Sequence, residues 1–142
     1  MWKCTERRSV AEADGGCRNV PYTVHFGVAT TYLPVKFFRT AVGSEPVREW
    51  LKSLAEEERR VIGQDLWVLQ EGWPIGMPLC RNLGQGLWEM RSDLPGRKIA
   101  RVLFCIHDGA IGLLHGFIKK TRKTPKSDLE LARNRKRELE NA

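Results

Sequence analysis

The sequence lacks a long apolar run. No window comes near the roughly 18–20 consecutive apolar residues that a membrane-spanning helix needs. Its first stretch, MWKCTERRSVAEADGG, carries charges but no apolar core of the length found in signal peptides. We therefore expect a cytoplasmic protein.

Residue types that bind metals are few and scattered. The four cysteines (Cys4, Cys17, Cys80 and Cys105) form no C-x-x-C pair, and the three histidines do not cluster near them, which argues against a zinc site. The chain also lacks the carboxylate cluster of a two-metal nuclease. We therefore expect no metal and no other cofactor, no disulfides in the cytosol, and a Cys105 that is buried as a small hydrophobe.

What the sequence does have is an uneven positive charge. The formal net charge is +7, and residues 96–142, with 12 basic and 5 acidic side chains, carry an excess of the same size. A concentrated excess of this kind attracts a polyanion such as RNA or DNA, or an acidic protein. A solvated basic tail explains the charge equally well.

The 142 residues fit a single folded domain. Weak periodicity sets residues 1–34 apart as an N-terminal extension that we expect to be disordered, and residues 35–142 form the predicted domain. The stretch YLPVKFFRTA, residues 32–41, is typical of a strand. Two helices follow, the first with Ser44 as N-cap and Pro46 in its first turn and the second over about residues 56–71. They should form an antiparallel hairpin, and the Gly- and Pro-rich residues 73–86 predict a loop.

After this loop the hydrophobic period changes from 3.6 to 2. Three strands are predicted in GLWEMRS, KIARVLFCI and AIGLLHGFIKK, and Asp108-Gly109 predicts a hairpin turn between the last two. Thr124-Pro125 should cap a final, highly charged helix. The order β-α-α-β-β-β-α predicts an α+β fold, with a small antiparallel sheet packed on an N-terminal helical hairpin.

Each of the three predicted meander strands places polar side chains among apolar neighbours. Because side chains alternate along a strand and these strands are adjacent, the polar residues should converge on one surface of the sheet. They are Glu89 and Arg91 in the first strand, Arg101 in the second, and His115 and Lys119 in the third.

Such a set suits a phosphodiester substrate. An arginine guanidinium binds phosphate oxygens in pairs, and Phe117 on the same strand face could stack on a base. Either His115 or Glu89 could move a proton, while arginine or lysine stabilises the charge that develops on phosphorus. If the substrate is RNA, its own 2′-OH can be the nucleophile, so that no metal and no protein nucleophile is needed.

Structural explanations of the same residues remain open. Glu89 and Arg91 could form an ordinary ion pair on a wet sheet face, and His115 could be a hydrogen-bonded core histidine. Arg101 could extend its charged end to solvent at a sheet edge. The pattern alone favours these explanations.

The run from residue 86 to residue 136 resembles the RelE/ParE toxin superfamily and, within it, the phage-derived HigB-like toxins. The matching elements are LWEMRS, the arginine-bearing strand ARVLF, the hairpin, the block LLHGFIKKTRKTP and the helix that contains ELA. EPVREWLKSL and GWPIGMPLCRNLGQG also fit the pattern, so that the similarity covers about Val35 to Glu138.

The resemblance implies a RelE-like fold and the toxin of a type II toxin–antitoxin pair. HigB-like members are mRNA interferases that cut messenger RNA in the ribosomal A site. Arg91 and Arg101 match strand arginines that contact phosphate, Lys119 matches a basic position at the end of the last strand, and His115 and Glu89 match polar positions on the same surface. RNA contacts are implied for Phe117, Lys120, Arg122 and Lys123.

The implied partners are a helix-turn-helix antitoxin, the ribosome and messenger RNA, with operator DNA bound only through the antitoxin. Two other functions remain open on the same fold. One is a ParE-like inhibitor of DNA gyrase, and the other is a catalytically inert, phage-derived basic binding module.

Overall fold

The computed structural model of the protein describes residues 32–120 and 122–142, and within them five strands and three helices. Their order along the chain is β1 (Val35–Phe37), α3 (Pro46–Lys52), α4 (Glu56–Gly72), β2 (Cys80–Gly84), β3 (Leu87–Leu94), β4 (Lys98–His107), β5 (Ala110–Ile118) and α5 (Lys126–Asn141). The predicted α+β class is therefore confirmed, with one strand more than expected.

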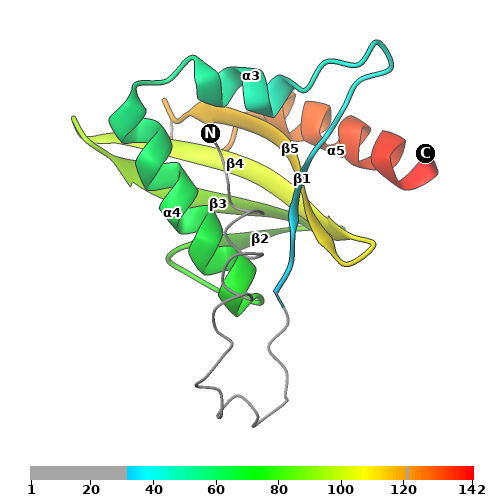
Figure 1. The fold of residues 1–142 in the computed structure, drawn as a ribbon, viewed down its shortest axis with the longest axis horizontal. Coiled ribbons are helices and arrows are strands. Elements are labelled where there is room, and N and C mark those ends of the chain that lie inside the picture. The colour runs from blue at the N-terminus through cyan, green and yellow to red at the C-terminus, as the bar shows by residue number, and fades with distance from the viewer. Residues whose placement is uncertain (1–31, 121) are drawn as a thin grey trace, which may run out of the picture.

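The strands form one mixed sheet in the order β1-β5-β4-β3-β2 (Figure 1). The prediction of a wholly antiparallel sheet is wrong at one edge, because β1 pairs with β5 in parallel, with Val35 opposite Ile111. The prediction of a continuous loop over residues 73–86 is also wrong. Its second half contains β2, whose sequence CRNLG has weak strand propensity but pairs with β3, and Cys80 lies opposite Met90 in the core.

Helices cover both faces of the sheet, so the molecule has three layers (Figure 1). On one face, α3 packs mainly on β5 and α4 mainly on β3. The predicted antiparallel hairpin is not formed, because α4 leaves the end of α3 obliquely and crosses the sheet instead of returning alongside it. On the opposite face, α5 packs on β4 and β5.

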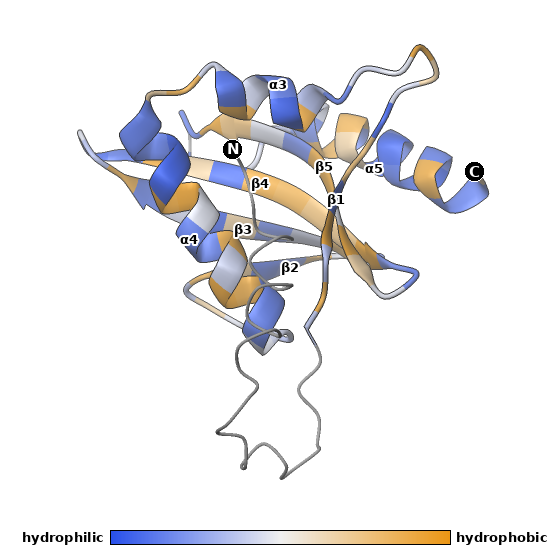
Figure 2. Ribbon diagram, in the orientation of Figure 1, coloured by the Kyte–Doolittle hydropathy of each residue, from blue (hydrophilic) through white to orange (hydrophobic). Residues whose placement is uncertain are grey.

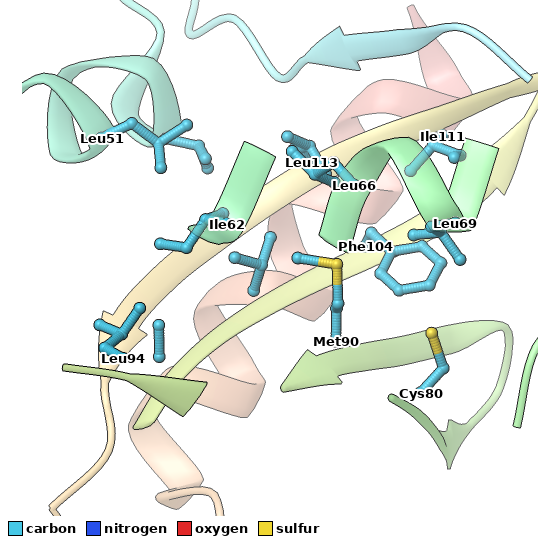
Figure 3. Packing of buried hydrophobic residues seen from close by; sticks show 13 residues of the cluster. Leu51, Ile62, Leu66, Leu69, Cys80, Met90, Leu94, Phe104, Ile111 and Leu113 are labelled. Carbon is cyan, nitrogen blue, oxygen red and sulfur yellow. The ribbon is translucent and has the colours of Figure 1, made fainter. Parts of the chain in front are cut away.

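The core under α3 and α4 is the larger of two apolar clusters. Ile62, Leu66 and Leu69 of α4 meet Met90 and Phe104 of the sheet with no exposed surface (Figure 3). Much of the β4 and β5 ribbon carries the colour of hydrophobic residues (Figure 2). The smaller cluster lies under α5 and includes Phe38, Leu87, Leu103, Cys105, Leu114 and Ala132.

Two predicted helix caps are wrong in detail. Glu45 occupies the N-cap position of α3, and Ser44 instead makes a 2.8 Å hydroxyl–hydroxyl hydrogen bond with Thr40. Pro125 occupies the N-cap position of α5, and the hydroxyl of Thr124 is used elsewhere. The predicted Asp108-Gly109 turn is confirmed, and both of its residues adopt the left-handed conformation that such a turn requires.

The predicted burial of Cys105 is confirmed, since its side chain is 0% exposed. Cys80 is also buried, and both are free thiols. Burial is the main cause that raises the pKa of Cys80 to about 12 and that of Cys105 to about 11. These thiols therefore serve packing, because a reactive cysteine needs an accessible thiolate.

The predicted N-terminal extension lies almost wholly outside the described residues. Its last part is described: Tyr32 and Leu33 lie against α4. The amide of Gln70 donates to the Tyr32 hydroxyl and to the Leu33 carbonyl, each at 2.9 Å. The chain therefore enters the domain on the α4 side of the sheet, away from α5.

Candidate functional site

Strand register brings the predicted polar residues together on the sheet face that α5 covers. Arg91 on β3 lies opposite Arg101 on β4, and Arg101 lies opposite Phe117 on β5. The apolar Leu103 of β4 lies between Glu89 on β3 and His115 on β5, opposite both of them. Three strands that are consecutive in the sequence thus bring these polar residues onto one face.

A β-bulge in β5 corrects the predicted alternation along that strand. The register shifts between Leu103 and Phe104 of β4, so Leu114 is the extra residue on β5. Leu113 therefore belongs to the core under α4, whereas Leu114 belongs to the cluster under α5. His115 shares its face with Phe117, as predicted, whereas Leu113 belongs to the opposite face.

Glu89 and Arg101 form a buried ion pair at the centre of these polar residues. Arg101 Nη1 lies 3.2 Å from Glu89 Oε2, and the two side chains are 2% and 0% exposed. Two structural alternatives are therefore wrong: Glu89 pairs with Arg101 and not with Arg91, and Arg101 lies in a central strand and not at an exposed edge. Burial lowers the pKa of the Arg101 guanidinium, and the charge of Glu89 partly offsets this.

The segment before α5 closes over this pair. Arg101 Nη1 donates to the Thr124 hydroxyl at 2.7 Å, and Arg101 Nη2 donates to the Arg122 carbonyl at 2.8 Å. The Thr124 hydroxyl in turn donates to Glu89 Oε2 at 2.5 Å. Contacts of this kind join residues 21 to 35 positions apart in the chain, which is why no local pattern predicted them.

Arg91 and Lys119 are partly exposed cations beside the pair. In the described part of the chain neither side chain makes a hydrogen bond or an ion pair, and Arg91 Nε is buried without a partner. Desolvation, followed by the charges of Arg101, Arg91 and Arg122, lowers the pKa of Lys119. These cations repel one another, and a bound anion would relieve that repulsion.

Arg81 is a further cation that the sequence reading missed. It lies on β2 opposite Glu89, and its charge also lowers the pKa of Arg101. Its place beside Glu89 could not be predicted, because the residues of β2 were predicted to form a loop. We call the resulting surface the cationic face, which consists of Arg81, Arg91, Arg101, Lys119 and Arg122 around the carboxylate of Glu89.

His115 is held by a partner that the sequence reading also missed. Its Nε2 lies 2.7 Å from Oδ1 of Asp128, in the first turn of α5, and the two side chains are 17% and 25% exposed. The ring stacks on Phe117 with centroids 5.4 Å apart. An ionised carboxylate can only accept, so Nε2 carries the proton and Nδ1 of a neutral ring is left as the acceptor.

The remaining predicted RNA contacts lie on the connection between β5 and α5. Lys120, Arg122 and Lys123 are exposed there. Arg122 belongs to the cationic face, and Lys120 and Lys123 continue the positive charge along the chain beside it. The predicted residues thus divide into a buried pair, a half-buried group and an exposed basic segment.

Other kinds of site find no support in the described ranges. No group of three or more His, Cys, Asp or Glu side chains there could hold a metal ion. No helix among the same residues is long and apolar enough to cross a membrane.

Comparisons with known proteins place the site within a matched region. A family model described as phage-derived protein Gp49-like (DUF891) matches residues 49–137, which is more than half of the chain. The matched span contains β2 to β5 and most of α5, and hence the whole cationic face with His115 and Asp128. A comparison with curated protein sequences found no match.

Proposed function

The chain belongs to the phage-derived Gp49-like family, within the RelE/ParE-like toxin superfamily, and from this premise we propose that it is the toxin of a type II toxin–antitoxin pair. We further propose that it is a HigB-like mRNA interferase that cuts messenger RNA on the ribosome without a metal. Membership of the family is consistent with a toxin.

The observation that carries the proposal is the cationic face. Five cations surround a single carboxylate, and that carboxylate is already paired with Arg101. Neither Arg91 nor Lys119 makes an ion pair among the described residues, and the charge of Glu89 only partly offsets the repulsion on Lys119. A phosphodiester supplies the missing negative charge, and partial burial strengthens its attraction to the two cations relative to bulk water.

The proposed reaction uses the nucleophile that RNA itself provides. His115 Nδ1 takes the proton from a ribose 2′-OH, and the 2′ oxygen attacks the adjacent phosphorus. The new O2′–P bond forms as the bond from phosphorus to the 5′ oxygen breaks, and the leaving 5′ oxygen takes a proton from solvent. The products are a 2′,3′-cyclic phosphate and a 5′-hydroxyl end, and Arg91 and Lys119 stabilise the charge that builds on the phosphoryl oxygens.

Asp128 gives His115 the tautomer that this step needs. The carboxylate holds the proton on Nε2, so the free lone pair on Nδ1 is available to a substrate. Glu89 is a weaker candidate for proton transfer, because it has no exposed surface and both Thr124 and Arg101 occupy its Oε2. We therefore assign the proton transfer to His115.

Binding of the RNA chain would involve the neighbouring residues. Phe117 is partly exposed beside His115 and offers a ring face or edge to a base, an interaction worth about 1–3 kcal/mol. Lys120 and Lys123 would attract the RNA backbone, of the messenger or of the ribosome, through long-range charge. The proposed location is the cytoplasm, where the ribosome is, and the proposed partner is a helix-turn-helix antitoxin that also binds the operator.

Induced expression in a bacterium followed by primer extension on an abundant messenger tests the proposal. The wild type should cut within translated codons, and Arg91→Ala should remove the cuts because it removes an unpaired cation from the cationic face. Arg60→Ala is a matched control, since Arg60 is exposed on α4 and its ion pair with Glu56 is exposed as well. His115→Gln, and Asp128→Asn to a lesser degree, should slow cutting without unfolding the protein.

Each other result points to a different function. Growth arrest with intact messenger and DNA-damage signalling would replace the proposal with gyrase inhibition on the same fold. Folded wild-type protein with no effect on growth and with intact messenger would indicate an inert basic binding module. Cuts that persist in a folded Arg91→Ala variant would show that the cationic face is not the active site.

A further inference from the structure

The buried contacts among Glu89, Arg101, Thr124 and the Arg122 carbonyl form a unit that we call the latch. We propose that Arg101 is a positioning residue that holds the basic segment 122–125 onto the sheet through this latch, and that it is not a phosphate ligand. This inference rests on the proposed function, because it assigns the roles of residues within the same site.

The nitrogen atoms of Arg101 are all turned toward the protein. Nη1 is shared between Thr124 at 2.7 Å and Glu89 at 3.2 Å, and Nη2 donates to the Arg122 carbonyl at 2.8 Å. Nε is buried and lacks a partner within the described residues. With 2% of the side chain exposed, a phosphate could reach Arg101 only after segment 122–125 had left the sheet.

The latch fixes two functional elements at once. It ties the backbone of Arg122, so that this exposed side chain stays beside Lys119, whose pKa it helps to lower. It also ties Thr124, two residues before the first residue of α5, and the first turn of that helix presents Asp128 to His115. Loss of the latch should therefore disturb the cationic face and the orientation of His115 together.

The charge pattern supports a holding role. Glu89 balances Arg101 locally, so the pair adds little net charge to the surface that RNA meets. Arg91 and Lys119 form no ion pair in the described part of the chain, although the charge of Glu89 acts weakly on Lys119. The latch also uses a neutral hydroxyl, that of Thr124, as the bridge between the two charges, and this residue can be changed without altering any charge.

Thr124→Val is the decisive variant, because it keeps the shape and β-branching of the side chain and removes only the bridging hydroxyl. Thr124→Ser is its matched control and keeps the hydroxyl. If the latch positions the site, Thr124→Val should slow single-turnover cleavage of messenger bound to ribosomes by about 10- to 100-fold. Thr124→Ser should restore most of the rate, and a merely stabilising role would leave the rate of the folded fraction unchanged.

Salt dependence separates positioning from phosphate binding. Affinity for a single-stranded RNA oligonucleotide, measured by fluorescence anisotropy at several salt concentrations, falls with a slope of about 0.7 per phosphate contact. Arg91→Gln should reduce this slope by about that amount, whereas Thr124→Val and the double variant Glu89→Gln/Arg101→Gln, which removes the buried pair without changing the net charge, should leave it unchanged. A slope that falls equally in Glu89→Gln/Arg101→Gln and in Arg91→Gln would overturn the inference.

A third measurement does not depend on RNA. Limited trypsin digestion should cut after Arg122 or Lys123 faster in Thr124→Val than in the wild type or Thr124→Ser, because the segment is released. If the wild type neither binds nor cuts RNA, the proposed function fails, and this digestion alone decides whether the latch exists. Equal cutting in Thr124→Val and the wild type would refute the latch whatever the function.

Discussion

Replacing Arg101 by methionine should strongly destabilise the protein. The substitution keeps most of the side-chain volume but leaves Glu89 as a carboxylate with no exposed surface. Its Oε2 would retain only the Thr124 hydroxyl, and its Oε1 already lacks a partner among the described residues. Breaking a buried ion pair on one side costs about 3–5 kcal/mol, which is a large part of the roughly 5–15 kcal/mol that stabilises a typical domain.

The double variant Glu89→Gln/Arg101→Met isolates the physical cause. With both charges removed, no ion is left buried without a counter-ion, so at least half of the lost stability should return. Replacing a buried ion pair by uncharged groups of similar volume is often close to neutral. If the loss came from altered packing alone, the double variant would be no more stable than Arg101→Met.

Urea denaturation at pH 7, followed by circular dichroism, measures these free energies of unfolding. Arg60→Met on the exposed face of α4 serves as the control, and it should cost less than about 1 kcal/mol because its ion pair is solvated. The reasoning would be refuted if the loss of stability in Arg101→Met lay within about 1 kcal/mol of that in the control. It would also be refuted if the losses in Glu89→Gln alone and Arg101→Met alone simply added in the double variant.

Three further expectations follow from the packing and the pKa shifts. Gly116→Ala should lower the free energy of unfolding, measured by urea denaturation, by about 1–3 kcal/mol, because its new Cβ would lie 2.5 Å from the Trp50 ring. Gly76→Ala is the control and should change little, because its Cβ would meet no atom within 4 Å beyond its chain neighbours. Equal losses in the two variants would contradict the close approach of Gly116 to Trp50. The two buried thiols should resist DTNB at pH 8 until the protein unfolds, in a variant whose other cysteines are serine; fast reaction of the native state would disprove their burial. The pKa of Glu58 is lowered chiefly by the hydrogen bond from Lys98, so its stabilisation is present above the unfolded pKa of about 4.3 and is lost as pH falls through the lower folded value. Lys98→Met should therefore flatten the fall of stability as pH drops below about 4.3, and an unchanged pH profile would rule out this role.

Local patterns in the sequence were enough to predict most elements. The Asp108-Gly109 turn has few alternatives, because only certain residues adopt left-handed conformations in a two-residue hairpin loop. Helical spacing predicted that α4 ends at about residue 71, one residue before its observed end at Gly72. Alternation along the strands also predicted that Glu89, Arg91 and Arg101 share one face, since a period of two is a property of the chain itself.

The ion-pair, hydrogen-bond and strand-pairing partners of these residues could not be predicted from local patterns. Arg101 pairs with Glu89 and not with its register neighbour Arg91, and the choice depends on segment 122–125 folding over the pair. The β-bulge in β5 and the parallel pairing of β1 depend on distant strands, and Arg81 joined the cationic face only through β2.

The sequence by itself determined which residues could carry charge on one face of a sheet, because strand periodicity and residue chemistry are local. Only the tertiary structure decided which of these charges are neutralised and which remain available. Asp128 meets His115 across 13 positions and Thr124 meets Glu89 across 35. Such contacts depend on how α5 packs against the sheet. Burial then separates a buried, paired Arg101 from a half-exposed Arg91 that makes no ion pair within residues 32–120 and 122–142.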